Sequence, residues 1–211
     1  EIYTILFVGS VKMCIRDRLV LVAPYLCYMR QDKAFHDGEA VSQRIVGRLL
    51  ADAFDRVVTV EPHLHRTPDL GAVLPGIEAT ALSAAPVLAE MIAAAGGADL
   101  LVGPDAESGP WVAAVAEHLG LPSITATKER SGDRDVRVTL ADAARAAGRR
   151  AVLVDDVVST GGTLAGCARA LAQAGAARIE AAVAHALCSD SDLAAMQAAG
   201  IARLRSTDSV A

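Results

Sequence analysis

The stretch from Arg150 to Gly175, RAVLVDDVVSTGGTLAGCARALAQAG, constrains the fold more than any other part of the chain. It begins with the apolar run Ala151 to Val154, which is typical of a strand buried on both faces. Two carboxylates follow, and then a short loop of hydroxyls and glycines. Apolar residues then recur at helical spacing until Gly175, a residue that commonly ends a helix. The sequence therefore predicts a strand, an acidic pair, a loop and a helix in direct succession.

The loop of this unit has the composition of a phosphate site. Its two glycines allow close approach of the backbone to a ligand, and N–H groups at the following helix N-terminus attract an anion. Its hydroxyls supply further donors. The predicted binders of a sugar 5-phosphate are Ser159, Thr160, Gly161, Gly162 and Thr163.

The acidic pair must face something other than the phosphate, because carboxylates repel a bare anion. Ribose hydroxyls, or Mg²⁺ held through water, are the partners we expect for Asp155 and Asp156. An ordinary strand-loop-helix with an exposed acidic pair is the plainer alternative. Two other motifs are excluded. No lysine follows the glycines, as the phosphate-binding loop of ATPases requires, and the residue two positions before Ser159 is Val157, where a nucleophile elbow requires glycine.

Strands and helices alternate along the rest of the chain. Apolar periodicity predicts strands near residues 19–26, 56–60, 99–103, 123–127, 136–140 and 179–187. It predicts helices near residues 41–53, 82–95, 110–119 and 190–200. In the first of these helices the buried stripe is expected to hold Val41, Ile45, Val46, Leu49, Leu50 and Ala53.

This alternation indicates an α/β fold with doubly wound parallel sheets. The proline- and glycine-rich stretch 66–76 suggests a division into two domains, residues 1–75 and 76–211. Since ligands of such folds bind beyond the carboxyl ends of the strands, the polar loops after the strands are the candidate sites.

The central stretch resembles the ribose-phosphate signature of the phosphoribosyltransferase fold. Other motifs narrow the likeness to the ribose-phosphate pyrophosphokinase family. Arg30-Gln31-Asp32-Lys33, preceding a helix, resembles the ATP-binding loop of that family, which implies ATP contacts for Arg30, Gln31 and Asp32. His63, in Glu61-Pro62-His63, stands where the family has a histidine near Mg²⁺-ATP; we assign His65 a structural role.

Two further motifs match the same family. Pro104-Asp105-Ala106 resembles its loop for pyrophosphate and metal. This implies that Asp105, like His63, is a metal-binding residue. Lys128-Glu129-Arg130 resembles its loop with a catalytic lysine and arginine, so Lys128 and Arg130 are the expected catalytic residues. The chain departs from the family at Glu107-Ser108, where two glycines are usual, and at Ser159, where a third aspartate is common.

The resemblance implies transfer of pyrophosphate from ATP to ribose 5-phosphate, with Mg²⁺ as cofactor, in a cytoplasmic homo-oligomer. A salvage phosphoribosyltransferase on the same fold is one alternative, and a non-catalytic regulatory homologue is another. The net charge of −5 argues against a nucleic-acid partner, and no apolar run reaches the length of a membrane span. The chain opens on Glu1, and the odd segment 12–18 interrupts two apolar runs, so we expect the first domain to be incomplete.

Overall fold

The computed structural model describes residues 3–5, 18–34, 36–130, 136–140 and 142–210. It forms two compact units, Glu1–Ser83 and Ala84–Ala211. The sequence analysis divided the chain after residue 75 instead. The boundary lies later because the strand at 78–82 pairs with a strand of the first unit. Most of the odd segment 12–18 lies outside the described residues.

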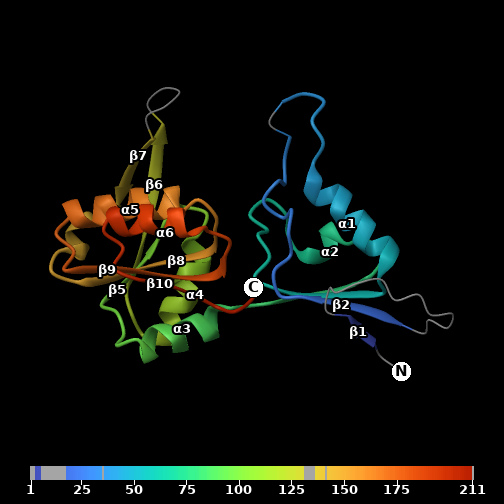
Figure 1. Cartoon of the computed structure of the whole chain (residues 1–211), viewed down its shortest axis with the longest axis horizontal. Coiled ribbons are helices and arrows are strands. Elements are labelled where there is room, and N and C mark those ends of the chain that lie inside the picture. Colours follow the sequence, from blue (N-terminus) through green and yellow to red (C-terminus); the bar gives the residue numbers. More distant parts are fainter. Residues whose placement is uncertain (1–2, 6–17, 35, 131–135, 141, 211) are drawn as a thin grey trace. The chain divides into compact units, whose positions relative to one another are not determined.

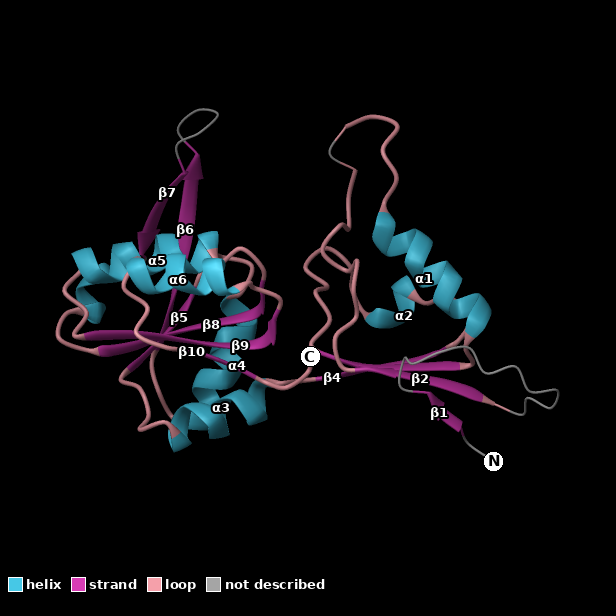
Figure 2. Cartoon of the chain, viewed as in Figure 1, coloured by secondary structure: helices cyan, strands magenta, loops and turns pink. Residues whose placement is uncertain are grey.

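The first unit is built on a four-stranded parallel sheet of order β1-β2-β3-β4. Its strands are β1 (Tyr3–Ile5), β2 (Leu19–Ala23), β3 (Arg56–Val60) and β4 (Glu78–Leu82). The helices α1 (Ser42–Ala53) and α2 (Leu70–Val73) lie on the same side of this sheet (Figure 2). Their shared core is formed by Leu21, Leu26, Met29, Val57, Leu70, Val73 and Leu74.

The buried face of α1 differs from the predicted stripe. Ile45 and Leu49 are 57% and 67% exposed, whereas Gln43 and Gly47 are buried. Gly47 faces α2 so closely that a methyl group there would stand 2.1 Å from the Val73 carbonyl oxygen. The stripe prediction was wrong because the contact with α2 requires a glycine, and this contact sets the rotation of the helix.

The second unit carries a six-stranded sheet of order β10-β9-β8-β5-β6-β7. Its strands are β5 (Leu100–Gly103), β6 (Ser123–Arg130), β7 (Val136–Leu140), β8 (Arg150–Val158), β9 (Arg178–Ala186) and β10 (Leu204–Ser206). All neighbouring pairs are parallel except β6 and β7, which form an antiparallel hairpin. A 3-10 turn, η1 (Ala143–Ala146), leads into β8.

Helices cover both faces of this sheet (Figure 1). On one face lie α3 (Ala85–Ala94) and α4 (Gly109–Leu119), and on the other α5 (Gly162–Gln173) and α6 (Asp190–Ala198). Leu153 and Val154 of β8 are fully buried, as predicted for a strand covered on both sides. The α/β fold with doubly wound parallel strands is therefore confirmed.

Three strands, β1, β4 and β10, were not predicted from the sequence. Two predicted strands were also too short. β6 continues through Lys128 to Arg130 where a charged loop was expected, and β8 continues past Val154 to Val158. Among the described residues, no helix is long and apolar enough to cross a membrane.

Candidate functional site

The acidic pair lies inside the carboxyl-terminal half of β8, not after it. Asp155 pairs with Val183 of β9, and the strand continues to Val158. The Asp155 carboxylate accepts a hydrogen bond from the Asp156 N–H at 3.1 Å, and that of Asp156 accepts one from the Val157 N–H at 2.7 Å. Both carboxylates are therefore held at the end of the sheet where ligands of this fold class bind.

The electrostatics of Asp155 indicate a concentration of negative charge. Burial raises the pKa of the Asp155 carboxyl well above its usual range, and the charges of Asp156 and Asp105 raise it further. Like charges that cannot all be neutralised by water favour a proton or a cation among them. A nearby cation, or hydrogen-bond donors such as sugar hydroxyls, would relieve this repulsion among the carboxylates.

Asp105 reaches this group from the turn between β5 and α4. The Ser108 N–H donates to Asp105 Oδ1 at 3.0 Å, and the Ser108 hydroxyl donates to the Asp105 carbonyl oxygen at 2.7 Å. A methyl group at Gly103 would stand 2.5 Å from the Ser108 Oγ, so the turn needs glycine at that position. The sequence analysis noted Ser108 only as a departure from the family's glycines, and in the structure its side chain and N–H fix the turn.

The predicted phosphate loop connects β8 to α5. Gly161 is the N-cap of α5 and adopts φ 69°, a left-handed conformation that favours glycine. It contributes no side-chain oxygen to the first N–H groups of the helix, and such N–H groups attract anions. Thr160 and Gly162 are exposed, whereas Ser159 and Thr163 are half-buried. The assignment of this loop as a phosphate site stays a prediction.

Lys128 and Arg130 lie in the β6–β7 hairpin, where their backbones pair with those of Val138 and Val136. The hairpin packs against α5, since Val138 is close to Gly166. The expected charged loop is thus partly a regular strand, because β6 gains a partner strand that the sequence analysis treated as separate.

In the first unit, the motif Arg30–Asp32 follows β2. Arg30 is exposed. The Gln31 amide donates to the Lys33 carbonyl oxygen at 2.9 Å and to that of Ala40 at 3.0 Å, and its oxygen accepts from the Ser42 N–H. The Asp32 carboxylate, with a side chain only 2% exposed, pairs with Arg66 at 3.2 Å. The side chains of Gln31 and Asp32, both predicted ATP contacts, are thus engaged within the protein.

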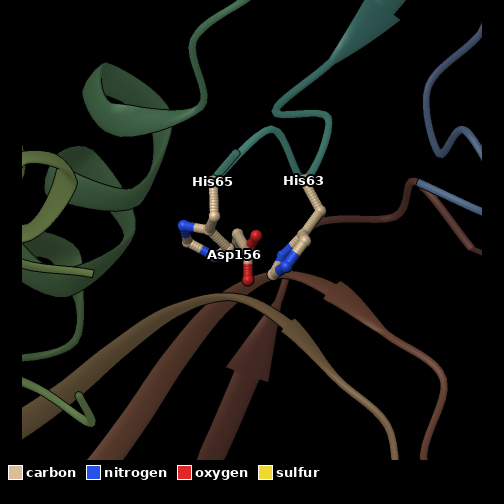
Figure 3. Close-up of side chains that lie close together, drawn as sticks. All are labelled: His63, His65 and Asp156. Atoms are coloured by element: carbon tan, nitrogen blue, oxygen red, sulfur yellow. The ribbon is translucent and has the colours of Figure 1, made fainter. Parts of the chain in front are cut away.

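His63 and His65 lie on the loop after β3, with ring centroids 3.9 Å apart in an edge-to-face arrangement (Figure 3). His63 is half-buried and His65 is exposed. This loop and the Arg30 loop follow neighbouring parallel strands, so both leave the same edge of the first sheet. Arg66, adjacent to this pair, was missed in the sequence because its partner Asp32 lies 34 positions away.

A cavity of about 210 Å³ lies at the opposite end of the second sheet, where β8 and β9 begin. Two of its lining residues, Arg150 and Arg178, are already paired with Asp99 and Glu180. We therefore do not assign it to the site formed by the acidic pair.

Comparisons with known proteins agree with this geometry. A family model described as a phosphoribosyl transferase domain matches residues 77–196. The chain is 36% identical over 190 residues to ribose-phosphate pyrophosphokinase 2 of Archaeoglobus fulgidus, covering 90% of this chain and 67% of that protein. It is 34% identical to the ribose-phosphate pyrophosphokinase of Methanopyrus kandleri, covering 92% of this chain and 66% of the relative.

The chain belongs to the ribose-phosphate pyrophosphokinase family. Among solved structures, the phosphoribosylpyrophosphate synthetase of Mycobacterium smegmatis matches with a TM-score of 0.77 and 27% identity, over 92% of this chain and 62% of that one. The chain thus spans about two thirds of the length of these relatives. The resemblance inferred from the motifs is confirmed at the level of family and fold.

Proposed function

We propose that this chain carries out the pyrophosphokinase reaction on ribose 5-phosphate. The observation that supports this most strongly is the order of groups along β8 and α5. A crowded carboxylate pair is followed at once by a glycine loop and a helix N-terminus. Such a succession suits a ligand with hydroxyls at one end and a phosphate at the other.

In this proposal the second unit binds ribose 5-phosphate. The loop Ser159–Thr163 holds the 5-phosphate through N–H groups and hydroxyls. Asp155 and Asp156 accept hydrogen bonds from ribose hydroxyls, which orients the anomeric carbon. The anomeric oxygen then forms a bond to the β-phosphorus of ATP while the bond to the oxygen bridging the α-phosphorus breaks, so AMP leaves. Positioning and charge neutralisation supply most of the catalysis in reactions of this kind.

The first unit, in the same proposal, binds ATP through the loops after β2 and β3. Arg30 would contact phosphates, as the exposed arginine of its loop, and His63 would lie near the metal-bound nucleotide. Asp105 is the proposed Mg²⁺ ligand of the second unit, and His63 is the proposed ligand of the first; when bound, Mg²⁺ would neutralise phosphate charge. The carboxylates around Asp155 fit this requirement, since their mutual repulsion is relieved by a cation.

Lys128 and Arg130 are proposed as the cationic groups that stabilise charge on the transferring pyrophosphoryl group. A side chain on a hairpin can approach a ligand without disturbing the sheet that carries the acidic pair. Arginine and lysine would act differently here, the first through a planar fork of donors and the second as a point charge.

The direct test is an AMP-release assay with the chain, Mg²⁺, ATP and ribose 5-phosphate. We expect AMP and phosphoribosyl pyrophosphate in equal amounts. Asp155→Asn is expected to lower the rate, and Asp142→Asn, a change at an exposed aspartate outside the site, provides the control. Pyrophosphate release from phosphoribosyl pyrophosphate and a purine base, without AMP formation from ATP, would favour the salvage transferase. Nucleotide binding without either reaction would favour the regulatory homologue.

A further inference from the structure

Polar contacts join the two loops of the first unit that carry Arg30 and His63. The first contact is an ion pair: Arg66 Nη1 lies 3.2 Å from each carboxylate oxygen of Asp32. The second is a hydrogen bond of 3.0 Å from the Thr67 hydroxyl to the Gln43 side-chain oxygen. Each contact links the segment after β3 to the segment after β2 or the helix that follows it.

The Asp32–Arg66 pair is asymmetric in exposure. The Asp32 side chain is 2% exposed, whereas that of Arg66 is 46% exposed. A carboxylate withdrawn from water to this extent needs a cationic partner, and removing that partner leaves an uncompensated buried charge. Asp32 is therefore directed at Arg66, and a carboxylate would in any case repel a triphosphate.

Gln43 fastens the Arg30 loop from the other side. Its side chain is buried, and its amide donates to the Met29 carbonyl oxygen at 3.1 Å, while its own backbone N–H donates to the Gln31 carbonyl oxygen at 3.2 Å. The residues on both sides of Arg30 are thus held by one glutamine. The backbone that carries Arg30 has little room to shift independently of α1.

Backbone strain occurs in the same two loops. Among the described residues, three non-glycine residues have positive φ: Tyr28 at 66°, Glu61 at 40° and Asp142 at 60°. Tyr28 lies in the first of these loops and Glu61 in the second. Such conformations persist only where the surrounding contacts over-determine them, and they cluster at functional sites. Here the contacts of Asp32 and Gln43 hold the two loops in these strained conformations.

We propose that Arg66 is a positioning residue for nucleotide binding. By pairing with Asp32, it holds the loop of His63 against the loop of Arg30. Both loops therefore have their nucleotide-binding conformation before ATP binds. The inference rests on the proposed function, in which these loops bind ATP. It also assigns Gln31 and Asp32 a supporting role: their side chains shape the loop, and Arg30 makes the phosphate contact.

A double-mutant cycle separates this role from direct contact of Arg66 with phosphate. Affinity for Mg²⁺-ATP is measured by calorimetry for Arg66→Ala, Asp32→Ala and the double variant. If Arg66 acts through Asp32, each single change weakens binding by about tenfold and the double variant is no weaker than either. If Arg66 contacts phosphate directly, Asp32→Ala tightens binding, because a negative charge is lost, and the effects add. That second result overturns the proposal.

Two further variants complete the design. Arg66→Lys keeps the charge and should restore part of the affinity lost in Arg66→Ala. Arg48→Ala removes an exposed arginine of α1 and should leave the affinity unchanged. An equal loss in Arg48→Ala would indicate a general effect of positive charge and would contradict a specific role for Arg66.

Amide hydrogen exchange tests the positioning without nucleotide. Arg66→Ala should raise exchange over residues 28–33 and 61–67 and leave α5 of the second unit unchanged. Unchanged exchange in both loops would overturn the positioning role even if ATP affinity falls. A wild-type chain that binds no Mg²⁺-ATP would instead contradict the proposed function, and exchange would still report whether Arg66 orders these loops.

Discussion

Met196 of α6 lies directly against Gly161, the residue that begins the phosphate loop's turn into α5. A methyl group built on Gly161 would stand 2.5 Å from the Met196 sulfur and 2.7 Å from its Cγ. Met196 is 1% exposed and belongs to the main core of the second unit. The loop therefore rests on the core, and its backbone position depends on a side chain about 35 residues further along the chain.

Gly161→Ala is the first prediction. We expect a loss of stability of about 1–3 kcal/mol, because alanine is strained at positive φ and its methyl group displaces Met196. We also expect weaker use of ribose 5-phosphate, because the loop backbone must shift. Thermal unfolding and the KM for ribose 5-phosphate measure the two effects.

Gly148→Ala is the matched control for this change. Gly148 has φ 70°, nearly that of Gly161, but no atom lies within 4 Å of a methyl group placed there. The difference between the two variants isolates the contact with Met196. Equal losses of stability, with an unchanged KM in both, would contradict a role for this contact.

Asp155→Asn is predicted to raise stability at neutral pH while it impairs ribose 5-phosphate use. The folded-state pKa of Asp155 is raised above the unfolded value, so ionisation above the unfolded pKa of about 3.9 penalises the folded state. The wild type therefore loses stability relative to the variant as pH rises through and above that value. Urea unfolding between about pH 3 and pH 8 should show the gain of the variant disappearing at the acid end.

Asp99→Asn serves as the comparison of opposite sign. Hydrogen bonds from Arg150 lower the pKa of the Asp99 carboxyl, so this carboxylate stabilises the folded state above the unfolded pKa. Its replacement should lower stability at neutral pH and have little effect in acid. A fall in stability at neutral pH for Asp155→Asn as well would show that the Asp155 carboxylate stabilises the fold. It would contradict the prediction that this carboxylate destabilises the fold and serves to bind a ligand.

Removal of divalent metal is the third prediction. Excess chelator should abolish AMP release, because the triphosphate is anionic and the repulsion around Asp155 favours a bound cation. Adding Mg²⁺ back beyond the chelator should restore the rate. The circular dichroism spectrum, recorded in both conditions, is the control for unfolding. Sustained AMP release in excess chelator would exclude the proposed role of the metal.

The sequence predicted those parts of the fold that depend on local patterns. The bounds of β3 and β7 follow from short β-branched runs and agree with the structure. The helix at Pro110 also begins as expected, with proline in its first turn. In contrast, β4 carries the alternation EATAL of small and polar residues, a weak signal that becomes a strand only through pairing with β3.

The candidate site could be predicted only in its residue types. The acidic pair and the glycine loop were recognisable because they are contiguous in the sequence. The partners that hold the site were not: the fold brings Arg66 to Asp32 and Met196 to Gly161. No local pattern indicates such pairs, since long-range packing decides which side chains meet.

Lys128→Ala and Arg130→Ala provide the last prediction: both should lower kcat far more than they raise the KM for ATP or ribose 5-phosphate. Ground-state ATP is already neutralised by Mg²⁺ and by Arg30 in the proposed mechanism. Charge moves toward the bridging oxygen and the transferring group only near the transition state, so a cation acting there affects kcat. The loss of one such donor commonly costs roughly 3–4 kcal/mol, or about 10²–10³ in rate.

Steady-state kinetics with AMP release as the readout measures this effect. Arg169→Ala, which removes an exposed arginine from α5, is the control for a general loss of positive charge. Because β6 pairs with β7 through backbone hydrogen bonds, the truncations leave the hairpin's own bonding intact, and unfolding curves should match those of the wild type. If both variants keep near-normal kcat, the hairpin carries only surface charge, and the proposed mechanism lacks the cations that stabilise its transition state.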